Sequence, residues 1–242
     1  MSKRIAVSVI LLFLAAGAQP GLAQGQGVGG RIGPTFTTFG GDADPDSKTG
    51  FIVGGFFIYS FSELVSVYPE LSYVRKGASS SGGVGVFIND RGELVEVTLE
   101  HTSNLDYAEL QVPITLTIPA RWIGVRVYAG PTVALELNCS AELRFETKTF
   151  SPAGTSLGVE SSTVSGACED ESPLGGPMFI STKSLDFGLV FGAGLDVGIG
   201  KGSIIGDFRF DLGLTDIRDG TGGSVKNRAF EILLGYVHYF SG

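Results

Sequence analysis

The sequence predicts an all-β protein, an eight-stranded antiparallel up-and-down β-barrel that crosses a membrane. Three observations predict this fold class. The 242-residue chain is 43% hydrophobic, only 17% charged, and has a mean hydropathy of +0.26, yet it contains no apolar run long enough for a membrane helix, which needs about 20 residues. Apolar and polar residues alternate with period two along several long segments. Short and long connections also alternate between these segments, as in outer-membrane barrels.

The first segment predicts export. Lys3 and Arg4 precede an apolar run over 5–18, and the small-x-small motif 21–23 follows. A basic start, a short apolar stretch and a small-residue cleavage motif are typical of a secretory signal peptide. We expect cleavage after Ala23, so that 1–23 is the signal peptide and 24–242 is the barrel domain. The alternative is a buried or amphipathic N-terminal helix.

Composition excludes several classes of protein. The formal charge of −8 argues against nucleic acid as a partner, because phosphate binding needs Lys and Arg. The positive hydropathy argues against a disordered chain. Two cysteines are too few for a disulfide-rich scaffold, while 37 glycines are roughly twice the usual share.

We expect eight strands, at about 28–39, 50–60, 64–77, 104–117, 121–137, 183–199, 203–215 and 227–240. The fourth carries its apolar face at Leu110, Val112, Ile114, Leu116 and Ile118, opposite Glu109 and Gln111. The fifth carries it at Ile123, Val125, Val127, Ala129, Val133 and Leu135. The sixth carries it at Leu185, Phe187, Leu189, Phe191, Leu195 and Val197. The seventh and eighth carry it at Phe208, Phe210, Leu212 and Leu214, and at Phe230, Ile232, Leu234 and Tyr236.

The length of these strands favours a membrane barrel over a soluble fold. Each alternating segment holds about ten or more residues, whereas strands of soluble proteins usually have about 5–6 and a tilted membrane strand needs about 9–11. The apolar face is nearly free of charge and the other face is polar, which fits lipid outside and a polar interior. A soluble secreted sandwich or lipocalin-like barrel remains the alternative.

The connections give an independent argument. Tight links are expected at 61–63, 118–120 and 200–202, and long links at 40–49, 78–103, 138–182 and 216–226. All long links then lie at one end of the barrel, which we expect to face outside, and both chain ends lie at the other. Within the second long link, 84–99 is expected to be a hairpin that turns at 89–92. Near the interfaces we expect aromatic side chains, among them Tyr73 and Tyr107 toward the outer side.

The inner face is expected to collect a polar cluster. Its predicted members are Arg31, Glu70, Glu109, Arg126, Glu136, Asp186, Asp196, Asp207, Arg209, Asp211 and Glu231. Buried charges need partners, so an ion-paired plug is favoured over an ion path or a substrate lumen. Glycines on the same face, such as Gly192 and Gly194, would leave room for these side chains.

Candidate sites outside the interior are few. Cys139 and Cys168 fall in one outer link and are expected to form a disulfide, because an exported protein meets an oxidising environment. Asp42, Asp44 and Asp46 form a D-x-D-x-D run, but the positions of a calcium loop that need Gly and Glu hold Ser47 and Val53. A solvated acidic turn is therefore favoured over calcium binding.

An enzymatic function is not expected. The only histidines, His101 and His238, belong to opposite ends of the predicted barrel, so they could not take part in one catalytic site. The chain contains no G-x-S-x-G, H-E-x-x-H or P-loop motif, and no motif for a cofactor or metal.

Several segments resemble a known family. PELSYVRKG (69–77), YAELQVPITL (107–116), YAGPTVALEL (128–137), DFGLVFGAGLDV (186–197) and LGYVHYF (234–240) are similar, in this order, to segments of PorT-type outer-membrane β-barrel proteins. The resemblance covers most of 28–240. It implies a small, eight-stranded, non-enzymatic barrel in the bacterial outer membrane. The secretion role of the named member is not carried over to this chain.

The sequence therefore favours an outer-membrane protein that is structural or binds a partner at the cell surface through its long outer links. A narrow pore or transporter for ions or small solutes is the second hypothesis, and a soluble secreted β-barrel binder is the third. The expected partners are outer-membrane lipid and an extracellular or periplasmic molecule that the sequence does not name.

Overall fold

The computed structural model describes residues 25–41, 46–120, 123–220 and 223–240, so the expected signal peptide lies outside the described residues. The described part is all-β, with strands β1 Gly27–Gly41, β2 Asp46–Ser60, β3 Val65–Val67, β4 Glu70–Ile88, β5 Leu94–Gln111, β6 Ile114–Ala120, β7 Ile123–Phe150, β8 Ser156–Ala167, β9 Leu185–Ile199, β10 Gly202–Gly213 and β11 Val225–Tyr239. Among the residues that the structure describes, no helix has the length and apolar character needed to span a membrane.

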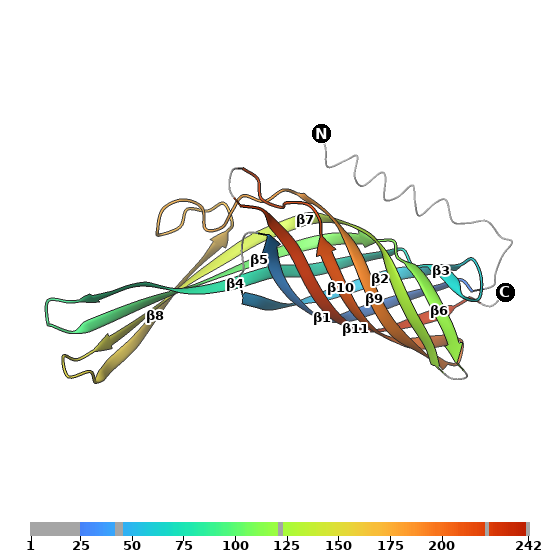
Figure 1. Ribbon diagram of the computed structural model, residues 1–242, viewed down its shortest axis with the longest axis horizontal. Helices are drawn as coiled ribbons and strands as arrows, with labels where there is room; N and C mark the ends of the chain where they lie inside the picture. Colours follow the sequence, from blue (N-terminus) through green and yellow to red (C-terminus); the bar gives the residue numbers. More distant parts are fainter. Residues whose placement is uncertain (1–24, 42–45, 121–122, 221–222, 241–242) are drawn as a thin grey trace.

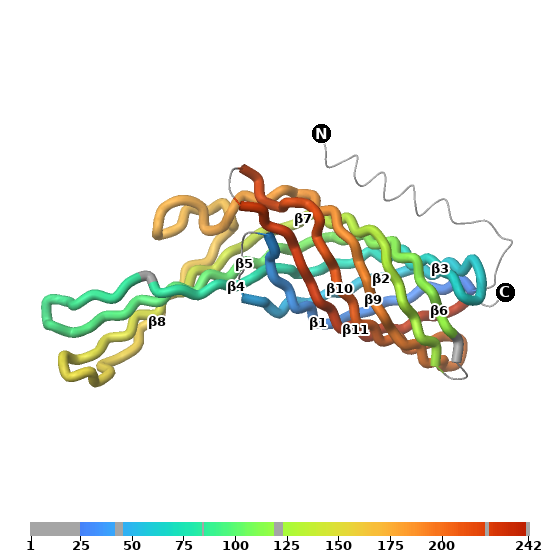
Figure 2. The backbone as a smooth tube through the Cα atoms, in the orientation of Figure 1, coloured from blue at the N-terminus to red at the C-terminus, as the bar shows by residue number. Residues whose placement is uncertain are grey.

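All the strand pairings are antiparallel, and they close on themselves. From β1 the ladders run through β11, β10, β9, β7, β5, β4 and β2, and β2 pairs with β1 again. Figure 1 shows these strands wrapped side by side into one body, and Figure 2 shows the same path of the backbone. The register is continuous at the closure, where Gly30 of β1 faces both Tyr236 of β11 and Gly55 of β2.

Two prolines divide segments that the sequence predicts as single strands. Pro69 lies between β3 and β4, and Pro113 lies between β5 and β6. Proline has no N–H to donate to a ladder, so the pairing stops there. The carbonyls of both prolines still accept hydrogen bonds, Pro69 O from Phe57 N of β2 and Pro113 O from Tyr68 N next to β3, at 3.0 Å each.

The outer ends of the strands extend much further than expected. The predicted links 78–103 and 138–182 are largely strand, because β4 and β5 continue to a turn at 89–93, and β7 and β8 form a hairpin that turns at 151–155. The first predicted long link, 40–49, is also shortened by β1 and β2. Residues with a preference for strands, chiefly Val, Thr and Phe, recur through these segments and allow pairing to continue beyond the barrel. The expected turn around 89–92 is confirmed, with Gly92 at a φ of +76°.

The two faces of the sheet divide as predicted. Outward-pointing apolar side chains are exposed along the barrel, for example Ile32 at 58%, Phe208 at 59% and Leu234 at 63%. Inward-pointing neighbours such as Arg209 and Glu231 are almost fully buried. An exposed apolar belt around a polar interior is the pattern of a barrel whose solvent is lipid.

Two inner glycines make room for large neighbours. A Cβ at Gly192 would lie 2.5 Å from the hydroxyl oxygen of Tyr128, and one at Gly194 would lie 3.0 Å from the carboxylate carbon of Asp207. The first distance is shorter than real Cβ atoms show, and the second is tighter than nearly all real Cβ contacts. The narrow interior can therefore hold Tyr128 and Asp207 only because the strand opposite has no side chains at these positions.

Candidate functional site

Most of the predicted polar cluster lies in the interior of the barrel, where its members form ion pairs across the ring of strands. Glu70 of β4 is the centre of the first group: its Oε2 is 2.9 Å from Arg209 Nη2 and also pairs with Arg31. Arg31 Nη1 is 3.1 Å from Asp207 Oδ2, and Asp207 Oδ1 accepts a 2.9 Å hydrogen bond from Arg126 Nη2. Arg126 Nε lies 2.8 Å from Asp196 Oδ1.

A second group adjoins the first and is built around a residue that the sequence analysis missed. Lys76 Nζ lies 2.6 Å from Glu109 Oε2 and pairs with Asp211. Glu231 belongs to the first group, because Arg209 Nη1 is 3.5 Å from Glu231 Oε2 while its Nη2 binds Glu70. A signal for Lys76 was present in the sequence, since it has the same parity as Glu70 on β4 and therefore points to the same face.

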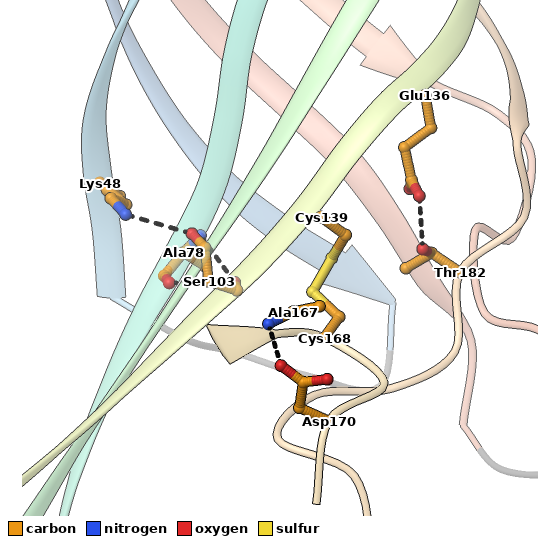
Figure 3. The surroundings of a disulfide bond; sticks show 9 residues. All are labelled: Lys48, Ala78, Ser103, Glu136, Cys139, Ala167, Cys168, Asp170 and Thr182. Carbon is orange, nitrogen blue, oxygen red and sulfur yellow. Dashed lines mark hydrogen bonds between the residues drawn. A yellow bond between two sulfur atoms is a disulfide. The ribbon is translucent and has the colours of Figure 1, made fainter. Parts of the chain in front are cut away.

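Two predicted members lie apart from this network. Asp186 is buried nearer the outer end and accepts hydrogen bonds from Asn227 Nδ2 at 2.8 Å and Thr215 Oγ1 at 2.5 Å. Glu136 is half-buried and accepts a 2.9 Å hydrogen bond from Thr182 Oγ1, at the base of the outer loops. Figure 3 shows that contact close to the disulfide. Neither carboxylate belongs to the ion-paired interior.

Aromatic rings lie beside the four cations of the interior. The guanidinium carbons of Arg31, Arg126 and Arg209 lie 4.9 Å from the Phe56 ring, 5.4 Å from the Tyr68 ring and 5.9 Å from the Tyr128 ring. Lys76 Nζ lies 5.7 Å from the ring of Tyr107. The expectation that Tyr107 marks the outer interface is wrong, because its side chain is fully buried in the interior. Its parity with Glu109 on β5 could have placed it there.

The interior contains more acid than base. Its connected carboxylates are Glu70, Glu109, Asp196, Asp207, Asp211 and Glu231, and its cations are Arg31, Lys76, Arg126 and Arg209. Among the residues that the structure describes, neither carboxylate oxygen of Glu231 has a hydrogen-bond partner. Buried charges that pair with one another, with aromatic rings beside them, fill the barrel interior and fix the register of the strands. This set of side chains contains no nucleophile with an adjacent base.

The outer mouth of the barrel is covered by a cap, which we define as residues 177–183. A disulfide between Cys139 and Cys168, with Cα atoms 5.4 Å apart, joins the loop before the cap to β7 (Figure 3). Phe179 N then donates to Cys168 O at 2.9 Å, and Lys183 N donates to Ile217 O at 2.7 Å. Phe179 also stacks on Phe39 of β1 at 5.8 Å between ring centroids. The cap is thus attached to β7, to the β10–β11 loop and to the barrel wall.

A sheet projects beyond the barrel on the same side, as Figure 1 shows at the left. We define this projecting sheet as residues 80–100 of the β4–β5 hairpin and 140–167 of the β7–β8 hairpin. β4 pairs with β5, β5 with β7 and β7 with β8. Among the described residues β8 pairs only with β7, and its side chains are mostly exposed.

The remaining candidate residues lie apart from one another. His238 pairs with Gly202 near the short turns, while His101 lies on β5 against Phe179, with ring centroids 5.5 Å apart. Burial lowers the pKa of His101 below its usual 6.5. Asp42 and Asp44 lie outside the described residues, and Asp46 begins β2. Within the described ranges, no group of three His, Cys, Asp or Glu side chains is placed to hold a metal ion.

Comparison with known proteins gives a family match and several distant structures. No curated protein matches the chain. Ail of Yersinia pestis, in complex with the heparin analogue sucrose octasulfate, is 14% identical with a TM-score of 0.36 and covers 88% of this chain and 98% of its own. Neisserial surface protein A (NspA) is 11% identical with a TM-score of 0.41 and covers 88% and 97%. The translocator domain of NalP from Neisseria meningitidis is 10% identical with a TM-score of 0.29 and covers 98% and 96%.

The family match spans most of the chain. Residues 18–219 match the family described as outer membrane protein beta-barrel domain. That segment contains strands β1 to β10 and the whole projecting sheet. The chain therefore belongs to the outer membrane protein beta-barrel domain family.

Proposed function

We propose that this protein is a non-enzymatic surface-binding protein of the bacterial outer membrane, and that it captures an extended peptide segment on the free edge of β8. The observation that carries the proposal is this edge, which lies outside the barrel and is not covered by another strand of the described part of the chain. The barrel serves as the anchor, and the projecting sheet is the binding element.

The anchor is proposed to be an eight-stranded barrel of the PorT type. If β3 with β4 and β5 with β6 each count as one interrupted strand, the closed ring of pairings has eight members. Closure leaves no open edge in the hydrocarbon, where an unpaired backbone group costs several kcal/mol. The exposed apolar belt supports this placement. Export through a signal peptide at 1–23 would bring the chain to the outer membrane.

The orientation follows from the lengths of the connections. The β2–β3 and β9–β10 links are short, whereas the hairpins and the cap lie together at the opposite end. Outer-membrane barrels have short turns on the periplasmic side and long ones outside. The projecting sheet would then face the cell exterior, where a partner can reach it.

Apart from one irregularity in the β7–β8 pairing next to the turn, the edge of β8 lacks the features that usually protect an exposed strand. Its 12 residues, SLGVESSTVSGA, contain no proline and no lysine, and Glu160 is the only charged residue. Native proteins usually protect such edges with charges, proline, bulges or short strands. An unprotected edge is a template for strand addition, in which main-chain hydrogen bonds supply most of the affinity.

The pattern of hydrogen bonds identifies the groups that are available on β8. Cys168 N donates to Cys139 O, so every second residue back from Cys168 directs its backbone toward β7. The N–H groups that point away from β7 are therefore those of Val159, Ser161, Thr163 and Ser165. Ala167 follows the same alternation, and its N–H is already bound by Asp170 at 2.7 Å. That bond, with the disulfide next to it, fixes the base of β8 (Figure 3).

The charge of the projecting sheet favours a basic partner. It contains seven carboxylates, Asp90, Glu93, Glu96, Glu100, Glu142, Glu146 and Glu160, and three cations, Arg91, Arg144 and Lys148. A second acidic copy of this chain would be repelled, whereas a segment with Lys or Arg would be attracted and steered to the edge. We therefore expect an extended, cationic peptide segment as the ligand.

A synthetic peptide of alternating Thr and Lys tests the proposal with the full-length protein in nanodiscs. Thr163→Pro removes one outward N–H while leaving the bonds to β7, so we expect binding to weaken at least tenfold. Thr163→Val keeps that N–H and is the matched control, which we expect to bind like the wild type. Equal binding by Thr163→Pro and Thr163→Val would refute strand addition on β8.

A further inference from the structure

A cavity of about 300 Å³ lies at the outer mouth of the barrel, between the cap and the barrel wall. Its lining includes Phe39 of β1, His101 of β5, Val225 of β11, the cap residues Phe179 and Ile180, and Arg218 from the β10–β11 loop. This mouth pocket is separate from the edge of β8, and from the ion-paired interior, whose charged residues do not line it. Its volume is at the lower end of the range for pockets that bind small molecules.

Most of the wall is apolar and aromatic. Phe39 and Val225 are nearly fully buried, and Phe179 stacks on Phe39. The His101 ring also lies beside Phe179, with 5.5 Å between the two ring centroids. These rings form a rigid surface that suits a flat aromatic or short aliphatic group.

The polar part of the wall consists of Ser79, Ser80, Ser103, His101 and Arg218, and Arg218 is its cation. Arg218 Nε is buried without a hydrogen-bond partner among the described residues, although the Asp216 carboxylate lies near enough to interact with the charge of the guanidinium. The nearby Asp216 carboxylate accepts instead from backbone groups, Arg218 N at 3.1 Å and Val225 N at 2.9 Å. His101 Nε2 is also buried without a partner.

The charge of the pocket is opposite to that of the molecule. The chain has 25 acidic and 17 basic residues, yet the residues that line the pocket include Arg218 and no Asp or Glu. A buried donor without a partner costs free energy, and a ligand that accepts its hydrogen bond recovers that energy. A guanidinium binds a carboxylate through two parallel hydrogen bonds.

We propose that the mouth pocket binds a small amphipathic anion, whose carboxylate pairs with Arg218 and whose aromatic or short aliphatic body lies against Phe39 and Phe179. The disulfide and the cap hold Phe179 in place, so the pocket exists before the ligand arrives.

Isothermal titration of the full-length protein in nanodiscs with 4-phenylbutyrate, and with the uncharged 4-phenylbutan-1-ol, tests the proposal. The wild type is expected to bind the carboxylate at least tenfold more tightly than the alcohol, because only the anion pairs with Arg218. Arg218→Gln removes this preference, whereas Arg218→Lys keeps much of it. Arg91→Gln, in the exposed turn of the β4–β5 hairpin, is the matched control and keeps the full preference.

Phe179→Ala is expected to weaken both ligands several-fold, because it removes part of the apolar wall. A wild type that shows no saturable binding of 4-phenylbutyrate, or an Arg218→Gln variant that keeps the wild-type preference, overturns the proposal. Gel mobility before and after heating verifies that each variant is a folded barrel. Since β8 does not line the pocket, peptide capture on β8 and anion binding here can fail independently.

Discussion

At the scale of single residues, parity along a strand decides whether a charge is buried or exposed. Arg75 and Lys76 are neighbours on β4, yet the Arg75 side chain is 40% exposed and the Lys76 side chain only 2%. Arg75 pairs with Asp106 on the outer face, and Lys76 pairs with Glu109 and Asp211 inside. Water or lipid headgroups can compensate the first charge, whereas only protein can compensate the second.

Lys76→Met is therefore expected to destabilise the barrel by about 3–5 kcal/mol, because it leaves two buried carboxylates without their cation. Arg75→Met, the adjacent control, is expected to cost about 1 kcal/mol or less, since its ion pair is partly exposed. Urea unfolding of both variants in lipid vesicles, followed by gel mobility, measures the difference. Similar losses in the two variants would contradict a buried role for Lys76.

Asp216 gives a pH-dependent prediction outside the membrane. Backbone hydrogen bonds from Val225 and Arg218 hold the pKa of its carboxyl below the usual 3.8. A carboxyl whose pKa is lowered in the folded state stabilises that state above its unfolded pKa, and this contribution is lost as the pH falls through the lowered value. We expect an NMR titration to give a pKa below 3.8 for Asp216, and the β10–β11 loop to loosen only under more acidic conditions. A pKa at or above 3.8 would contradict the two backbone bonds.

At the scale of elements, the sequence predicted the strands best where lipid forces the pattern. The expected 183–199 and 227–240 correspond to β9 and β11 within about two residues at each end, because every second side chain there must be apolar. The extension of β7 to Phe150 and the strand β8 were not predicted, since pairing beyond the membrane depends on which strands become neighbours. Parity identified most of the charged interior, but the ion-pair partners depend on the register between distant strands.

The disulfide is expected to stabilise the outer elements rather than the barrel. It joins the start of the projecting part of β7 to the end of β8, and the two cysteines have a sequence separation of 29. In the chain-entropy model, closing such a loop contributes about 3–4 kcal/mol. A Cys139→Ser/Cys168→Ser variant should therefore show faster hydrogen exchange in β8 and the cap, with unchanged exchange in β9 to β11. Equal acceleration in β9 to β11 would show that the disulfide supports the whole barrel.

At the scale of the whole molecule, the interior is closed in layers. The ion-paired network lies between an apolar cluster toward the outer mouth, which includes Phe39, Leu105 and Val225, and another toward the short turns, which includes Phe56, Ile58 and Val237. A narrow ring of strands has an interior just wide enough for side chains, and here aromatic and charged side chains fill it. These layers support a plug rather than the alternative of a narrow pore.

The purified protein in a planar lipid bilayer is therefore expected to show no steady unitary conductance. An ion would have to separate pairs such as Arg209 with Glu70 or Arg126 with Asp207, whose side chains are at most 1% exposed. A porin added to the same bilayer is the control that shows the measurement detects an open barrel. Stable conductance steps from the wild type would refute the plug and favour a transport function, while leaving peptide capture by β8 to be decided by its own test. A closed interior instead confines binding to the outer surface, where the mouth pocket and the free edge of β8 lie.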